Sequence, residues 1–195
     1  MKSMSKGFTL LELLIVIAIL AILTTVVVLV LNPAEYLAQA RDSQRLSDIS
    51  TLNSAVSLYL SSISAISWGS GCLTFPSTYC TASSTYATPN NSSTCTSVSS
   101  STAVGNGAGG GYGWLPLDFK SLSAGSPIAK EPIDPTNSAT LKYSYNCNST
   151  ANTYEIDARM ESAKYKNGGG SNVESTDGGN ASTTYEMGTD LTIIY

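Results

Sequence analysis

Few side chains in this sequence could carry out nucleophilic or acid–base chemistry. Its 195 residues contain no histidine, 10 lysines and arginines, and 14 aspartates and glutamates. Without an imidazole, the chain by itself supplies neither a Ser-His-Asp or Cys-His nucleophile nor a histidine-ligated zinc. Glu155 and Asp157 would share one face of a strand opposite Ile156, which indicates solvated surface. We therefore predict that the protein is not an enzyme, and we keep a membrane-tethered enzyme as a distant alternative.

Oxygen ligands for a hard cation gather near the C-terminus. Between Asn172 and Asp190 the acidic side chains include Asp177 and Glu186, and no lysine or arginine follows Lys166. Calcium takes about six to eight oxygen ligands of this kind. The other interpretation is a solvated acidic turn. We predict that no cofactor is required, and Asp177, Glu186 and Asp190 are the candidate calcium ligands.

Two other kinds of binding site are not indicated. The formal net charge is −4, whereas a nucleic-acid-binding surface is basic, so we predict no general nucleic-acid binding. Residues 105–110 spell G-x-G-x-x-G, but no apolar strand precedes them, and residues 112–116 (Y-G-W-L-P) follow where a helix should begin. The glycine run is therefore predicted to be an exposed loop.

One apolar segment is long enough to cross a membrane. Residues 13–31 form a run of 19 residues without a charge, close to the roughly 20 that span a hydrocarbon core of about 30 Å. Lys2 and Lys6 precede it and the next basic residue is Arg41, so the N-terminus is predicted to be cytoplasmic and the rest exported. No small-residue cleavage site follows the run. We predict a single-pass precursor in the plasma or inner membrane that keeps this segment.

The start of the apolar run carries a motif. A short basic leader with Lys2 and Lys6 ends at Gly7, the aromatic Phe8 follows, and the acidic Glu12 stands four residues later. This pattern resembles the processing signature of type IV pilins and of type II secretion pseudopilins. The resemblance implies that a prepilin peptidase cuts between Gly7 and Phe8, that the leader is removed, and that Phe8 is N-methylated.

Glu12 is an acid near the cytoplasmic end of an apolar helix. A carboxylate at mid-helix costs about 2.5–3.5 kcal/mol on insertion scales, and less near the interface. In an arbitrary single-span protein it would reach back to Lys6 or to lipid headgroups. The resemblance implies instead that it pairs with the α-amino group of Phe8 in a neighbouring subunit, which favours helix bundling in one register. We therefore expect a homo-oligomeric helical filament, with an inner-membrane assembly platform as a partner.

The apolar segment is predicted to continue as a long helix with a kink at Pro33, because proline lacks an N–H and clashes with the preceding turn. Beyond it, an apolar stripe typical of an amphipathic helix comprises Leu46, Ile49, Leu52, Val56, Leu60 and Ile63. The predicted parts are a cleaved leader at 1–7, a helix over 8–60 with a membrane or filament-core part at 8–31 and an amphipathic part at 32–60, and a head over 61–195.

The head is predicted to combine a Ser/Thr/Gly-rich, disulfide-bonded insertion with a small antiparallel sheet. Residues 61–117 are rich in Ser, Thr and Gly and contain no charge. Within residues 140–195, apolar and polar residues alternate over 141–147 and again over 154–160, which indicates a hairpin with one packed face. The segments 185–187 and 191–195 would add a strand or a closing tail. We predict an α+β fold, resembling the pilins, in which the helix packs on this sheet.

Four cysteines lie in the part that we expect to be exported: Cys72, Cys80, Cys95 and Cys147. Exported cysteines typically form structural disulfides. Three connectivities are possible, and we favour Cys72–Cys80 with Cys95–Cys147. A metal site with all four cysteines as ligands is the alternative, but the sequence contains no C-x-x-C pair to support it.

These predictions lead to a structural role. We expect a pilin, the subunit of a type IV pilus-like extracellular filament, which serves adhesion or motility. The uncharged, hydroxyl-rich insertion and the disulfides favour such an exposed fibre. The alternative is a major pseudopilin of a type II secretion system. Residues 132–135 (P-I-D-P) are loosely similar to pseudopilin heads, and the candidate calcium loop at 172–190 also favours that alternative. Sequons at Asn91 and Asn148 are candidate glycan acceptors.

Overall fold

The computed structural model describes residues 7–64, 66, 68, 78–80, 95–98 and 113–194, and the side chains of all of these except residues 29, 78–80 and 95–98. The chain divides into two compact units, Met1–Leu37 and Ala38–Tyr195. Several predicted features lie outside the described residues: Lys2, Lys6, Cys72, Asn91 and the glycine run 105–110.

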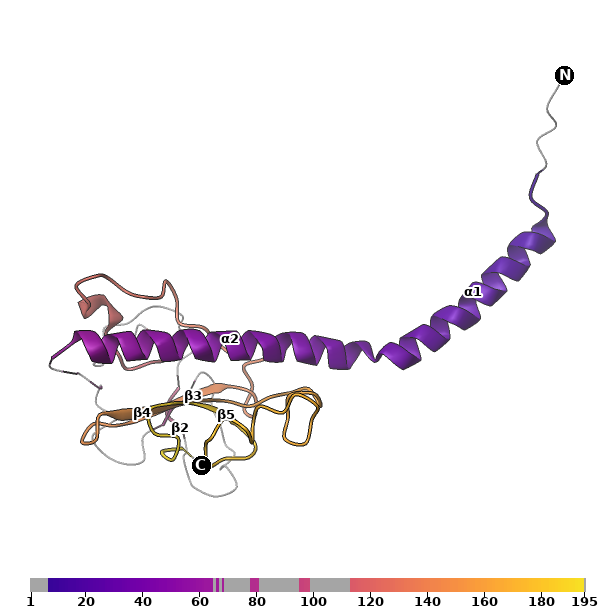
Figure 1. The fold of residues 1–195 in the computed structure, drawn as a ribbon. Helices are drawn as coiled ribbons and strands as arrows, with labels where there is room; N and C mark the ends of the chain where they lie inside the picture. The colour runs from indigo at the N-terminus through magenta and orange to yellow at the C-terminus, as the bar shows by residue number, and fades with distance from the viewer. Residues whose placement is uncertain are drawn as a thin grey trace. The chain divides into compact units, whose positions relative to one another are not determined.

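The first unit contains α1, Leu10–Leu31, and the start of α2, Pro33–Ser62 (Figure 1). α1 ends where Asn32 adopts a left-handed backbone with φ 40°, which asparagine tolerates better than most residues. The main-chain oxygen of Asn32 accepts hydrogen bonds from two amides in the first turn of α2, at 3.0 and 3.4 Å. Pro33 occupies the first position of α2, where no amide donor is needed. The helix is thus interrupted at the Asn32-Pro33 step.

In the second unit, α2 turns one face to the core. Its buried side chains recur at steps of three or four residues and comprise Ala38, Asp42, Arg45, Ile49, Leu52, Ala55, Val56 and Tyr59. Three members of the predicted apolar stripe, Leu46, Leu60 and Ile63, are partly buried against the same core. The buried face therefore carries two charged residues, Asp42 and Arg45, between Ala38 and the apolar part that begins at Ile49.

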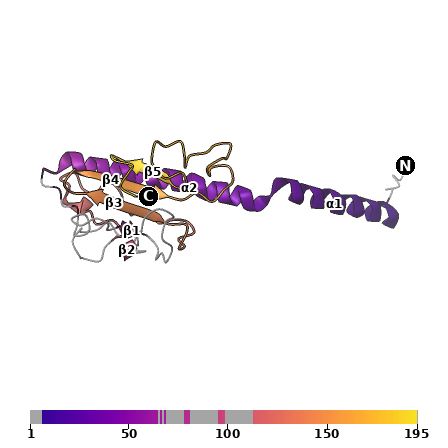
Figure 2. The same ribbon diagram turned by 90° about the horizontal axis from the view of Figure 1, so that it is seen from below.

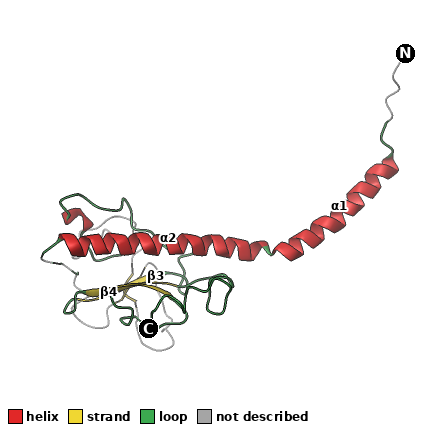
Figure 3. Cartoon of the chain, viewed as in Figure 1, coloured by secondary structure: helices red, strands yellow, loops and turns green. Residues whose placement is uncertain are grey.

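The sheet of the second unit has five described strands: β1 Thr78–Cys80, β2 Cys95–Val98, β3 Tyr143–Asn148, β4 Thr153–Ala158 and β5 Tyr185–Gly188. Their order is β2-β1-β3-β4-β5, and all neighbours are antiparallel except β1 and β2. α2 lies along this sheet in both views (Figures 1 and 2), and a short loop connects β3 to β4 (Figure 3). The predicted α+β fold is confirmed. The sheet is larger than predicted, because β1 and β2 come from the Ser/Thr/Gly-rich insertion at 61–117.

The core lies between α2 and one face of the sheet. Its side chains from β3 and β4 include Tyr143, Tyr145, Tyr154 and Ile156. The Tyr143 hydroxyl donates to Asp48 Oδ2 and the Tyr154 hydroxyl to Asn53 Oδ1, both at 2.7 Å. The short helix η1, Phe119–Ser121, adds Phe119, whose ring meets that of Tyr59 edge-on at 5.8 Å. These contacts fix which face of the sheet points toward α2.

The sheet order bears on the predicted cysteine pairs. Cys147 on β3 is disulfide-bonded. β1 stands between β2 and β3, so the backbone of Cys95 lies two strand spacings from β3, about 9–10 Å. A disulfide joins Cα atoms no more than about 7 Å apart. The order therefore argues against the predicted Cys95–Cys147 pair. The predicted Cys72–Cys80 pair falls outside the described side chains.

Candidate functional site

The Gly7–Phe8 peptide lies ahead of the first helix in an open segment. Residues 7–9 have no regular secondary structure, and the Phe8 side chain is 79% exposed. Apart from its two chain neighbours, no described residue has an atom within 4 Å of the position that a Cβ on Gly7 would take. Exposed segments of this kind are the usual sites of proteolytic cleavage. The structure thus leaves the predicted cleavage position accessible.

A capping box holds Glu12 in the first turn of α1. Its carboxylate accepts hydrogen bonds from the Thr9 amide at 2.9 Å and the Thr9 hydroxyl at 2.8 Å, while Thr9 Oγ1 accepts from the Glu12 amide at 3.2 Å. The arrangement satisfies backbone donors at the helix start and places a negative charge at its positive end. Within the described residues the Glu12 carboxylate forms no salt bridge. The capping box therefore holds this carboxylate at the start of α1, with no charged partner among residues 7–64 or the other described parts of the chain.

α1 exposes apolar side chains around its circumference. No residue of the stretch Leu10–Val28 is buried within the structure. The hydroxyls of Thr24 and Thr25 donate to main-chain oxygens one turn back, at 2.9 and 2.8 Å, so these polar groups need no outside partner. By length and composition the stretch can cross a membrane. A helix that is apolar all round is normally covered by lipid or protein, which fits a membrane-anchored precursor.

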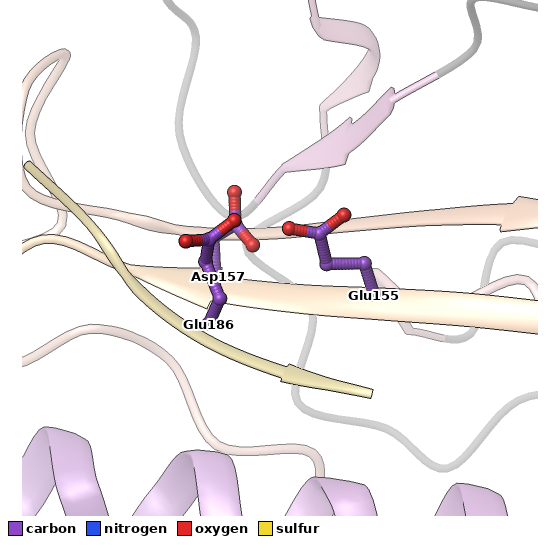
Figure 4. A group of neighbouring side chains, drawn as sticks. All are labelled: Glu155, Asp157 and Glu186. Carbon is purple, nitrogen blue, oxygen red and sulfur yellow. The ribbon is translucent and has the colours of Figure 1, made fainter. Parts of the chain in front are cut away.

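A second group of functional side chains lies in the sheet. Glu155 and Asp157 on β4 and Glu186 on β5 form what we term the carboxylate cluster, on the face of the sheet that points away from α2 (Figure 4). Ligand oxygens of the three lie within 4.8 Å of one another. Asp157 stands directly opposite Glu186 in the strand pairing. The residues are 0%, 5% and 1% exposed, in that order.

Burial raises the pKa of each carboxyl in the cluster, and for Glu155 and Asp157 the charge of a neighbouring cluster carboxylate raises it further. Burial, and next the charge of Asp157, raises the pKa of Glu155 to about 11. Burial, and next the charge of Glu186, raises the pKa of Asp157. Burial also raises the pKa of Glu186, against the opposing effect of hydrogen bonds that it accepts. In the cation-free chain these shifts favour protonated carboxyls.

The sequence-based interpretation of Glu155 and Asp157 as solvated surface is wrong. The C-terminal segment covers this face of the sheet, and the amides of Ile193 and Ile194 each donate to Glu155 Oε2 at 2.7 Å. Strand alternation correctly placed the two acids on one face. It could not show that this second face is also buried, because the covering segment is remote in sequence.

The predicted calcium ligands are only partly brought together. Glu186 belongs to the carboxylate cluster. Asp177 is outside the cluster but helps to position Glu186, because Asp177 Oδ2 accepts a hydrogen bond from the Glu186 amide at 2.7 Å. Asp190 instead accepts from the amide and hydroxyl of Thr192, at 3.2 and 2.6 Å, in a local turn. The structure therefore groups Glu186 with Glu155 and Asp157 rather than with Asp190.

A buried ion-pair network connects α2 to the loop at 132–135. Arg45 donates from Nε and Nη2 to the two oxygens of Asp134 at 2.6 and 2.9 Å, and from Nη1 to Asp42 Oδ1 at 2.7 Å. Burial alone would lower the pKa of Arg45, but the hydrogen bonds and charges of Asp134 and Asp42 outweigh it and raise that pKa. All three side chains are buried in a fully paired network. Their arrangement therefore indicates a structural role.

Comparison with known proteins bears on the N-terminal segment. The family model described as the prokaryotic N-terminal methylation motif matches residues 2–28. No curated protein and no solved structure matches the chain. The matched region contains the open Gly7–Phe8 peptide, Glu12 with its capping box, and most of α1. The N-terminal segment of this chain therefore carries the prokaryotic N-terminal methylation motif.

Proposed function

We propose that this protein is a pilin, the structural subunit of a type IV pilus-like extracellular filament. The observation that carries the proposal is α1, a helix with exposed apolar side chains along its length and a methylation motif at its start. Such a helix must be covered by lipid before assembly and by other helices after it. The second unit, with its own core, is the head that the filament displays.

Maturation would take place at the open N-terminal segment. A prepilin peptidase would hydrolyse the Gly7–Phe8 peptide, release residues 1–7, and leave an α-amino group on Phe8. A free α-amino group is largely protonated at neutral pH. N-methylation of Phe8 adds a methyl group to this amine and keeps its capacity for positive charge. The mature chain then begins with a cation four residues before Glu12.

Assembly would pair these two charges between subunits. A carboxylate and an ammonium group are each costly in an apolar environment, and the cost falls when they form a hydrogen-bonded pair. Glu12 of one subunit and Phe8 of its neighbour can form such a pair in only one axial register. The capping box keeps the Glu12 carboxylate at the helix start, which reduces the ordering entropy of pairing.

The proposed route runs from the inner membrane to the cell surface. The precursor is inserted once in the plasma or inner membrane, the prepilin peptidase processes it, and an assembly platform extrudes the subunits as a filament. A major pseudopilin would follow the same first steps. The segment 132–135, whose likeness to pseudopilin heads is one ground for that alternative, contains Asp134, which holds the buried Arg45. We favour the pilus because the uncharged, hydroxyl-rich insertion at 61–117 suits an exposed fibre.

Processing is tested by the intact mass of the subunit. We expect the chain, produced in cells that contain a prepilin peptidase, to lose residues 1–7 and to gain one methyl group on Phe8. The matched control is Gly7→Leu, which adds a side chain in open space next to the cleaved bond and should leave the precursor uncut in the membrane. A wild-type subunit that still begins at Met1 under these conditions would contradict the proposed function.

A further inference from the structure

The carboxylate cluster leaves three buried oxygens without a hydrogen-bond partner. They are Glu155 Oε1, Asp157 Oδ1 and Glu186 Oε1, and each belongs to a side chain that is at least 95% buried. An unpartnered polar atom in a protein interior is costly, and most buried carboxylates are paired or bind a metal. One such atom could be an isolated exception. Here three neighbouring carboxyls each have one, and their ligand oxygens lie within 4.8 Å of one another (Figure 4), so protons or a cation must satisfy them.

The second oxygens and the backbone hold these carboxylates in position. Glu155 Oε2 accepts the amides of Ile193 and Ile194 at 2.7 Å, and Glu186 Oε2 accepts the amide of Ala181 at 3.0 Å. Glu155 and Glu186 therefore each have one oxygen held by backbone donors, while the other oxygen of each is among the three without a partner. Ligands of metal ions in proteins are typically oriented by hydrogen bonds of this kind.

Gly179 packs directly against the Glu186 carboxylate. A Cβ at this position would collide with Glu186 Oε2 and Cδ, so only glycine fits there without moving the acid. Asp177 holds the same turn, since its Oδ1 accepts the Gly179 amide at 3.1 Å while its Oδ2 accepts the Glu186 amide. The turn and β5 thus position Glu186 together.

We propose that Glu155, Asp157 and Glu186 bind one calcium ion in the interior of the second unit. The ligand atoms lie within 4.8 Å of one another, a separation that a single ion with bonds of about 2.3–2.6 Å can bridge. Magnesium, with bonds of about 2.0–2.1 Å and a strict octahedral geometry, fits a set this wide less well. Zinc prefers nitrogen and sulfur ligands, and the cluster offers only carboxylates.

Calcium would remove the repulsion that the cluster otherwise contains. In the cation-free chain the raised pKa values of the three carboxyls favour the uptake of protons, which reduces that repulsion. A divalent cation would replace those protons and complete its shell with second carboxylate oxygens, backbone carbonyls or water. Because the site is buried and the C-terminal segment covers it, calcium binding is coupled to folding of the head. This inference is independent of the proposed pilus function.

The test is calcium titration of the full chain in detergent after removal of metal by a chelator. We expect calorimetry to show one site per chain. We also expect the melting temperature, followed by near-ultraviolet circular dichroism, to rise by about 5–10 °C at a hundredfold excess of calcium over Kd. Unchanged melting in calcium and in chelator, with no binding heat, would show that the cluster holds only protons and would overturn the proposal.

Two matched variants locate the site. Asp157→Asn removes one ligand charge and should abolish the calcium response, while the cation-free variant melts at the same or a higher temperature because repulsion is reduced. Glu186→Gln makes the equivalent change on β5 if Asp157→Asn does not fold. Asp190→Asn makes the same chemical change outside the cluster and should keep the full response. Loss of the response in Asp190→Asn but not in the cluster variants would contradict the assignment.

Discussion

Replacing Glu12 by alanine is expected to leave a processed, membrane-inserted protein that does not form filaments. The charge on Phe8 of each neighbour would lose its partner, and breaking a buried pair in this way costs about 3–5 kcal/mol. That cost weakens each subunit contact by roughly a hundredfold to several thousandfold. The measurement is the yield of the subunit in the sheared extracellular fraction relative to the membrane fraction.

Two further variants separate charge pairing from helix capping. Glu12→Gln keeps a side chain that can accept from the Thr9 amide but removes the charge, and we expect it to fail like the alanine variant. Thr9→Ala removes the hydroxyl of the capping box, at a cost of about 0.5–2 kcal/mol in helix stability, but keeps the acid, and we expect it to assemble. Assembly of Glu12→Gln at normal yield would show that capping, and not charge pairing, explains the acid.

The second large effect is expected at Arg45. Arg45→Ala leaves the buried carboxylates of Asp42 and Asp134 without their cation, and we expect the free energy of unfolding to fall by about 3–5 kcal/mol. Arg41 provides the control, because its pair with Glu161 is partly exposed, at 34% and 26% of the side chains. Arg41→Ala should cost less than about 1 kcal/mol.

Urea unfolding of the full chain in detergent, followed by near-ultraviolet circular dichroism, measures both changes. The signal comes from aromatic residues in the core of the second unit, among them Trp114 and Tyr143, whose ring centroids are 6.4 Å apart. If Arg45→Ala and Arg41→Ala lower the free energy of unfolding by equal, small amounts, the buried network contributes no more to stability than a surface ion pair does. Both variants should still be processed between Gly7 and Phe8, since the cleavage segment lies in the first unit.

The features that local sequence determines could be predicted. Apolar length alone indicates α1, and the Asn32-Pro33 step predicts its interruption, because a missing amide and a left-handed asparagine act within one turn. The β3–β4 hairpin follows from alternation, although the strands run over 143–148 and 153–158 rather than 141–147 and 154–160. Residues 2–13 contain the whole processing motif, so no tertiary contact is needed to find it.

Features that depend on distant segments could not be predicted. From the sequence alone, Arg45 would belong to a solvated helix face. In the fold it is buried against Asp134, which stands 89 positions later in the chain. The carboxylate cluster needs the β4–β5 register, which sets Glu186 opposite Asp157. It also needs the C-terminal segment that buries Glu155. For the same reason the cysteine pairs were not determined by spacing, since the sheet inserts β1 between β2 and β3.

Assembly into a filament is the central claim, and immunogold electron microscopy of the fraction sheared from the cell surface tests it most directly. The account predicts thin filaments labelled along their length by antibodies against the head, in cells that also contain the prepilin peptidase and assembly platform. Head antigen found only in the membrane fraction of such cells, with no labelled filament in the sheared fraction, would contradict it.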